Sequence, residues 1–119
     1  LSDDCPDLYS PKVLRAAMGG VFRQPVLMSR DLPGLIRSMR EKGIDTLAAA
    51  LDRSAMTSDE ARLDRDGVAV VIGNEGSGLS TEMIEACGKT VFIPISERSE
   101  SLNASVAASI FLWEMRRRG

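Results

Sequence analysis

The chain has 119 residues, 44% of them hydrophobic and 27% charged, which suits one small soluble domain with a single core. Its longest apolar run is far short of the roughly 20 residues that cross a bilayer, and its acidic start lacks a signal peptide's apolar run, so we expect a cytoplasmic protein without a membrane partner. The net charge of −2 excludes the strongly basic class of nucleic-acid binder, and the absence of histidine removes the commonest general base and metal ligand. Cys5 and Cys87 form no CxxC pair, so we expect neither a structural disulfide nor a metal site.

Helix and strand signals alternate along the first half of the chain. Ser10 followed by Pro11 is a typical helix start, with a capping hydroxyl and a proline in the first turn. Pro25 lies in a short apolar run and suggests an edge strand or a bulge. Asp31 can cap the next helix. The elements predicted here are a helix over residues 11–18, a strand over 21–27, a helix over 32–42 and a strand over 44–51.

The second half continues the alternation after a polar, irregular stretch at residues 52–66. Residues 68–72 are a continuous apolar run, typical of a central parallel strand that is covered on both faces. The remaining predicted elements are a helix over 80–86, a strand over 90–94 and a helix over 103–118. This order predicts an α/β fold with a mostly parallel sheet, in which ligands bind beyond the carboxyl ends of the strands.

Residues 73–78 directly follow one predicted strand and contain three glycines. Glycine lets the backbone approach a ligand closely and adopt positive φ. The loop is no Walker A motif, because no Lys-Ser/Thr pair follows its last glycine, and it also misses the dinucleotide fingerprint spacing. A tight strand-to-helix turn is the structural alternative. Glu75 within the loop can orient a cationic or hydroxyl partner.

The last strand ends at Ile93-Pro94-Ile95, where proline removes a ladder donor. The backbone beyond such a break is available to a ligand, although proline can equally be a simple strand terminator. Ser101 or Asn103 can then cap the last helix.

That last helix is apolar almost all round, which indicates burial on more than one side. We expect it to pack on its own sheet and on a second subunit, with Phe111, Trp113 and Met115 as interface anchors. A central core helix in a monomer is the alternative.

Together these stretches resemble the SpoU/TrmH family of RNA ribose 2′-O-methyltransferases, in the knotted SPOUT superfamily. Residues 70–80 match its second motif, a hydrophobic strand followed by G-x-E-x-x-G-L. Its third motif reads I-P-M, a short loop, S-L-N-V-S-V-A and a helix ending in E-x-x-R, and it corresponds to residues 93–95, 101–107 and 114–117. Residues 10–23 resemble the family's segment before the second motif, so the match covers nearly the whole chain.

The resemblance implies an α/β domain with a C-terminal trefoil knot, threaded from Pro94 onward, and a homodimer formed through the C-terminal helix. It also implies S-adenosylmethionine as cofactor and the ribose 2′-hydroxyl of rRNA or tRNA as methyl acceptor. Asn103 and Glu75 match catalytic positions that line the reaction centre. The implied cofactor contacts are Ala49, Gly73, Ile93, Ser101 and Leu102.

One departure from the family concerns its first motif, an Asn followed several residues later by an Arg, which is missing here. That Arg is the family's candidate for activating the ribose hydroxyl. We therefore expect residues 1–119 to be a single, N-terminally truncated methyltransferase domain, without the family's first strand and helix. Loss of the activating group is the other explanation.

Two alternative functions stay open. One is a catalytically incomplete fragment, or an RNA-binding or dimerisation module, that retains the cofactor pocket. The other is a nucleotide-binding domain that uses residues 73–78 for phosphates.

Overall fold

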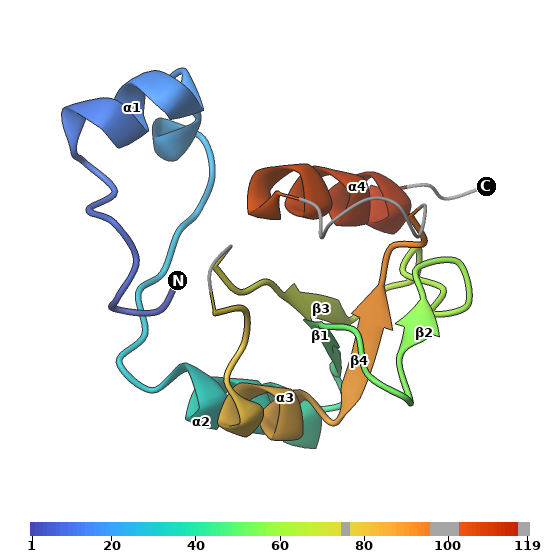
Figure 1. The fold of residues 1–119 in the computed structure, drawn as a ribbon. Coiled ribbons are helices and arrows are strands. Elements are labelled where there is room, and N and C mark those ends of the chain that lie inside the picture. Colours follow the sequence, from blue (N-terminus) through green and yellow to red (C-terminus); the bar gives the residue numbers. More distant parts are fainter. Residues whose placement is uncertain (75–76, 96–102, 117–119) are drawn as a thin grey trace.

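In a computed structural model, residues 1–74, 77–95 and 103–116 are described, and helices alternate with strands among them (Figure 1). None of the helices in these ranges is long and apolar enough to span a bilayer. In chain order the elements are α1 (Pro11–Ala17), the 3₁₀ helix η1 (Gly20–Phe22), α2 (Leu32–Glu41), β1 (Asp45–Ala49), β2 (Met56–Thr57), β3 (Val68–Val71), α3 (Thr81–Cys87), β4 (Lys89–Phe92) and α4 (Ala104–Arg116).

The four described strands form one sheet in the order β2-β4-β1-β3, and every pair in it is parallel. β1 pairs with β3 through Ala48 and Val71, and with β4 through Ala49 and Val91. Because all strands run the same way, their carboxyl ends meet at one edge of the sheet. The predicted parallel α/β fold is confirmed.

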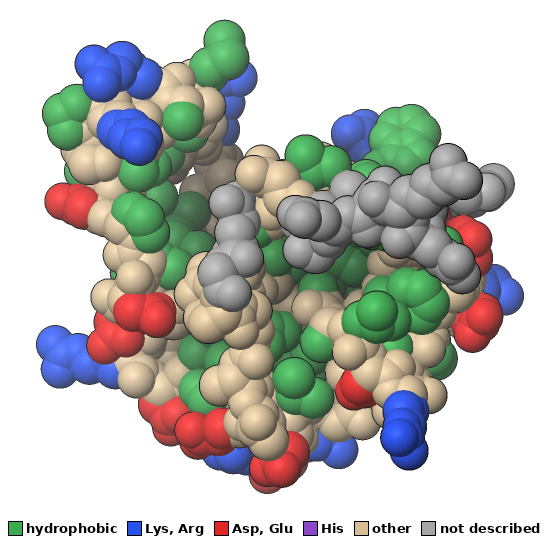
Figure 2. All heavy atoms as spheres, in the orientation of Figure 1, with side chains coloured by type: hydrophobic (Ala, Val, Ile, Leu, Met, Phe, Trp, Pro, Cys, Tyr) green, Lys and Arg blue, Asp and Glu red, His purple; other side chains and the backbone are tan. Residues whose placement is uncertain are grey.

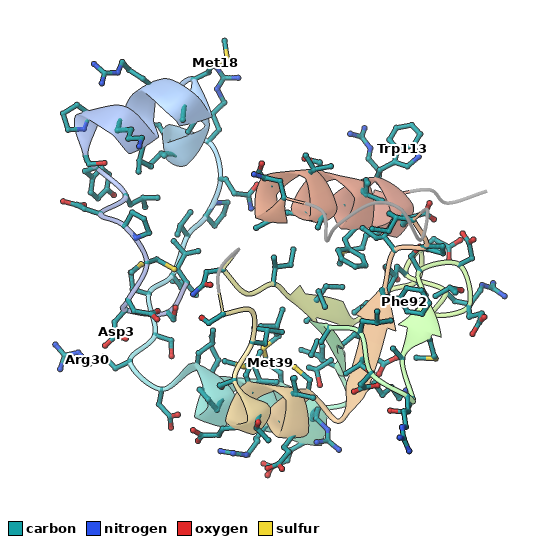
Figure 3. The ribbon with its side chains drawn as sticks, in the orientation of Figure 1. Asp3, Met18, Arg30, Met39, Phe92 and Trp113 are labelled. Atoms are coloured by element: carbon teal, nitrogen blue, oxygen red, sulfur yellow. The ribbon has the colours of Figure 1, made fainter. Side chains whose placement is uncertain are left out.

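Helices cover both faces of the sheet, with α2 and α3 on one side and α4 on the other (Figure 1). Successive strand residues point to opposite faces. Ala48 therefore joins the core under α2 and α3, whereas its neighbour Leu47 joins the core under α4. Met39 of α2 packs against the first of these cores (Figure 3).

Three helices begin at the side-chain caps that local chemistry favours. The Ser10 hydroxyl accepts a hydrogen bond from the Val13 amide, and the Asp31 carboxylate accepts one from the Gly34 amide. Ser80 does the same for the Met83 amide at the start of α3. The predicted starts of α1 and α2 are confirmed.

The predicted strand over residues 21–27 is wrong. Gly20–Phe22 form a 3₁₀ turn, and no residue from 23 to 28 belongs to a strand. The side chains of Phe22 and Leu27 are exposed, so the run is apolar without being part of a core. An apolar run predicts burial only where a partner surface exists.

β3 is also placed differently from the prediction. It is an edge strand of the described sheet rather than a central one, and only Val71 of its four residues is fully buried. The polar stretch 52–66 is likewise less irregular than expected, since it contains β2 and the buried side chains of Ala61 and Leu63.

Residues 1–30, named here the N-terminal arm, extend away from the sheet (Figure 1). None of their side chains is fully buried. The two ends of the arm are joined where the Ser29 amide donates to the Leu1 carbonyl and Ser2 bridges Ser29. The arm is thus a long loop whose two ends are hydrogen-bonded to each other, and it contributes little to either core.

Candidate functional site

Three of the predicted cofactor residues lie at the carboxyl edge of the sheet. Ala49 is the last residue of β1, Gly73 follows β3 by two residues, and Ile93 comes directly after β4. The register of β1 with its two neighbours brings these three strand ends together. This edge is where ligands of open parallel α/β sheets bind.

The loop after β3 is tightly closed by its own backbone. A Cβ atom on Gly73 would lie 2.4 Å from the carbonyl carbon of Gly78, so only glycine fits there. Gly78 has φ +66°, and its amide donates to the Asn74 carbonyl at 3.1 Å. The Asn74 side-chain oxygen accepts from the Ser77 amide at 2.7 Å. Both glycines therefore meet requirements of the turn itself, as the structural alternative expects.

Asn74 is a residue of this loop that the sequence analysis passed over. Asn is a common turn-forming residue because its side chain can hydrogen-bond the backbone a few residues on. That signal was present in the sequence.

Glu75, Ser101 and Leu102 lie outside the described residues. Asn103 is described, and it caps α4. Its side-chain oxygen accepts from the Ser105 amide at 2.8 Å and from the Ser105 hydroxyl at 2.6 Å. Its carbonyl accepts from the Ala107 amide, the first bond of the helix. The cap therefore uses the oxygen of the exposed carboxamide, and the amide nitrogen is the group with which Asn103 can donate to a ligand.

An apolar surface continues beyond the strand ends. Leu51 and Ile95 follow β1 and β4, and both side chains are exposed. Asp52 anchors the first of these loops to the sheet, because its carboxylate accepts from the buried Thr90 hydroxyl of β4 at 2.9 Å. This hydrogen bond is the main reason that the pKa of Asp52 is lowered; desolvation opposes it, and hydrogen bonds from Ser54 and Ala55 add to the lowering.

Two faces of α4 have different environments. Phe111 is 2% exposed and packs in the core under the helix, with Met115 beside it. Trp113 is 67% exposed and points away from the sheet (Figure 3). The prediction that Phe111 anchors a subunit interface is wrong, because its ring is already buried in the core of its own chain.

Comparison with protein-family models matches residues 1–113 to the SpoU rRNA Methylase family. The chain belongs to this family. The match extends over the closed loop, the strand ends and most of α4.

Known SpoU relatives extend the comparison. The 23S rRNA (guanosine(2553)-2′-O)-methyltransferase RlmP of Bacillus subtilis is 30% identical over 116 residues, which cover 98% of this chain and 46% of that protein. A TrmH-family structure from Porphyromonas gingivalis superimposes with a TM-score of 0.87 at 33% identity, covering 100% of this chain and 48% of that one. An AdoMet-bound rRNA methyltransferase from Sinorhizobium meliloti gives 0.86 at 31% identity, with coverages of 98% and 44%. The chain thus spans less than half the length of each of these relatives.

A polar hollow of about 280 Å³ lies at the opposite edge of the sheet, where β1 and β4 begin. Its charged groups have partners within the chain. Lys89 and Arg65 both form salt bridges with Asp45, and Arg40 donates to the Ala86 carbonyl at the end of α3. Burial alone would raise the pKa of Asp45, but the hydrogen bonds and charges of Arg65 and Lys89 outweigh it and lower that pKa. We assign this hollow a structural role.

Proposed function

We propose that this SpoU-family domain binds S-adenosylmethionine at the carboxyl edge of its sheet, and that the whole protein methylates the ribose 2′-hydroxyl of rRNA or tRNA. The observation that supports this most is the meeting of Ala49, Gly73 and Ile93 at one edge, from three strands that are dispersed in the sequence. The cofactor in the Sinorhizobium relative's structure and the 2′-O activity in the name of the Bacillus relative support the same function.

The described residues fit this cofactor. Exposed Leu51 and Ile95 offer apolar contact for an uncharged adenine ring, and the strand ends offer backbone groups for its nitrogen atoms. Gly73 and Gly78 of the turn carry no side chains, so their backbone groups could approach the cofactor closely. We propose Ala49, Gly73, Ile93, Ser101 and Leu102 as the cofactor contacts.

The bound cofactor would supply an electrophilic methyl group, and the protein would then mainly need to position the acceptor oxygen in line with it. We propose that Asn103 uses its amide nitrogen for this positioning, since the α4 cap fixes its oxygen. Glu75 would orient neighbouring donors. A protonated ribose hydroxyl is a poor nucleophile and also needs a proton acceptor or a charge-stabilising group.

We also propose the family's homodimer and trefoil knot for this domain. Trp113 and Leu112 form an exposed apolar strip on the outer face of α4, and aromatic anchors of this kind are enriched at interfaces. Much of the knotted stretch lies in residues 96–102, outside the described residues, so the knot stays a prediction. We propose residues 1–119 as one domain.

Calorimetric titration of S-adenosylmethionine into the 119-residue chain tests the cofactor site. We expect binding of S-adenosylmethionine and none of ATP. A preference for ATP would support the nucleotide-binding alternative and contradict the proposal.

Methyl transfer to transcribed rRNA and tRNA by the full-length protein tests the activity. Cofactor binding without transfer would identify a non-catalytic module. In an active protein, undiminished turnover by the Asn103→Ala variant would refute the role of Asn103.

A further inference from the structure

We propose that the N-terminal arm is a contact surface for a single-stranded stretch of the RNA substrate. This inference rests on the proposed function, which supplies RNA as the partner. It assigns the contact to residues 10–30, named here the basic segment, rather than to the sheet or to α4.

Charge is distributed unevenly along this acidic chain. The basic segment contains Lys12, Arg15, Arg23 and Arg30 and no acidic residue. The whole chain has 15 Lys or Arg and 17 Asp or Glu, so the rest holds 11 cations against 17 anions, a net charge of −6. A polyanion is therefore repelled by most of the molecule and attracted to the basic segment.

The four cations are available to a partner. Their side chains are exposed, and none of them forms an ion pair within the described part of the chain. Figure 2 shows Lys and Arg side chains grouped on α1 and η1, with acidic side chains lower on the arm. Arg30 lies near that acidic base, close to Asp3 (Figure 3). Lys12, Arg15 and Arg23 are thus the stronger phosphate contacts.

Large apolar side chains lie among these cations in the sequence. Tyr9, Met18 and Phe22 are 65%, 85% and 74% exposed, and Met18 projects outward from the arm (Figure 3). No residue of α1 or η1 is buried, so the core formed by the described residues does not explain this apolar content. Aromatic platforms beside cations suit single-stranded RNA, whose bases stack on the rings while its phosphates contact the charges.

The position of the arm agrees with this assignment. The arm rises on the side of the sheet toward which the arrowheads of β2 and β4 point (Figure 1). That is the side of the proposed cofactor site. RNA held on the arm would therefore approach the reacting methyl group rather than the hollow at the opposite edge.

A second copy of the chain is the other occupant to consider for an exposed apolar surface. Charged residues are depleted at the centre of protein interfaces. A surface that carries Lys12, Arg15 and Arg23 fits such an interface poorly, whereas the outer face of α4 fits it better. We therefore favour RNA on the arm.

The test combines charge removal on the arm with a matched control. Lys12, Arg15 and Arg23 are replaced together by Ala, and the control replaces the exposed Arg37, Lys42 and Arg62 of the body, which changes net charge equally. The probe is a fluorescein-labelled, mixed-sequence RNA of about 20 nucleotides, longer than the roughly 16-nucleotide upper site size of single-strand binding folds. Fluorescence anisotropy is recorded with the 119-residue chain at several salt concentrations.

We expect the arm variant to bind this RNA roughly 10-fold or more weakly than the unmodified chain, with a salt slope reduced by about 2, since each single-strand phosphate contact contributes about 0.7. The control should stay within about twofold. Phe22→Ala should also weaken binding while Phe22→Trp preserves it, because stacking needs a ring. Equal RNA binding by the arm variant and the unmodified chain would overturn the proposal.

Two further measurements distinguish this proposal from the proposed cofactor function and from a subunit interface on the arm. S-adenosylmethionine titration should be unchanged in the arm variant, and failure of the unmodified chain to bind the cofactor would refute the proposed function instead. Sedimentation should show the same oligomeric state for both proteins. If the arm variant dissociates a dimer and loses RNA binding only with it, the arm is a subunit interface and the inference is wrong.

Discussion

Asn103 combines a structural role with a proposed catalytic one in a single side chain. Its oxygen holds the first turn of α4, and this fixes the direction of its amide nitrogen. A capping residue with a fixed side chain at the start of α4 is therefore well placed to position a substrate. A substitution to alanine removes both roles together, so a variant that keeps the cap but removes the donor is needed to distinguish them.

Aspartate at position 103 separates the two roles. It keeps an oxygen acceptor for the Ser105 amide but lacks the donor nitrogen. We expect Asn103→Asp to preserve the free energy of unfolding and to abolish most methyl transfer, whereas Asn103→Ala also loses about 1 kcal/mol of stability. Denaturant unfolding and single-turnover assays measure the two effects. Full activity in the aspartate variant would contradict a donor role.

Gly73 makes a second prediction at the residue scale. A methyl group there would meet the Gly78 backbone at 2.4 Å, so Gly73→Ala must open the turn. We expect a loss of about 1–3 kcal/mol in stability, as for overpacking, together with weaker S-adenosylmethionine binding. Gly20→Ala is the control, since a Cβ there meets nothing within 4 Å. Unchanged cofactor affinity would show that the turn does not shape the site.

Local side-chain chemistry could be predicted from the sequence, and distant pairings could not. The caps Ser10 and Asp31 act on amides three residues away, so a short window contains both partners. The Asp52–Thr90 hydrogen bond joins residues 38 apart in the sequence, and only the parallel sheet brings them together. Gly73 and Ile93 were predictable as strand ends because they lie in the family's second and third motifs, and Ala49 because it lies near the end of the apolar run 44–51.

At the scale of elements, α4 shows what an apolar helix does and does not reveal. Its composition predicts burial on more than one side, yet Phe111 is the one fully buried residue of its described part, and Leu112 and Trp113 are exposed. Composition also does not tell which aromatic ring enters the core of the chain. The same ambiguity explains the strand wrongly expected at residues 21–27 and the edge position of β3. The composition of a segment indicates whether its side chains tend to be buried, while the topology of the fold determines which surface buries them.

Paired substitutions in α4 test this division. Phe111→Ala should lower the free energy of unfolding by about 3–4 kcal/mol, because it empties a filled core site. Trp113→Ala should leave the stability of the monomer nearly unchanged and weaken the proposed dimer. Chemical unfolding and sedimentation at several protein concentrations distinguish these effects. A large loss of monomer stability from Trp113→Ala would contradict the assignment of its face.

At the scale of the whole molecule, Asp45 connects three distant parts of the chain. Its carboxylate in β1 pairs with Arg65 before β3 and with Lys89 in β4. These contacts lie at the edge opposite the proposed site, so they stabilise the sheet without occupying the cofactor surface.

The pKa of Asp45 predicts how this stabilisation depends on pH. Because the folded state lowers that pKa below its unfolded value of about 3.9, the contribution is complete above that value and is lost as pH falls through the folded pKa. Asp45→Asn should therefore cost about 1 kcal/mol at pH 7, since both cations are partly solvated. The difference should shrink below about pH 4. Urea unfolding of both proteins at the two pH values measures it, and a constant difference would contradict the ion-pair explanation.

The strand order has a further consequence for how the chain reaches its native state. β4 is the last strand of the described sheet in chain order, yet it lies between β2 and β1, and no two consecutive strands pair. During synthesis β2 has no neighbour until residues 89–92 leave the ribosome. Loops must close before any such pairing forms, which makes folding slow. We therefore expect β2 to join the sheet late, when β4 inserts between β2 and the β1–β3 pair.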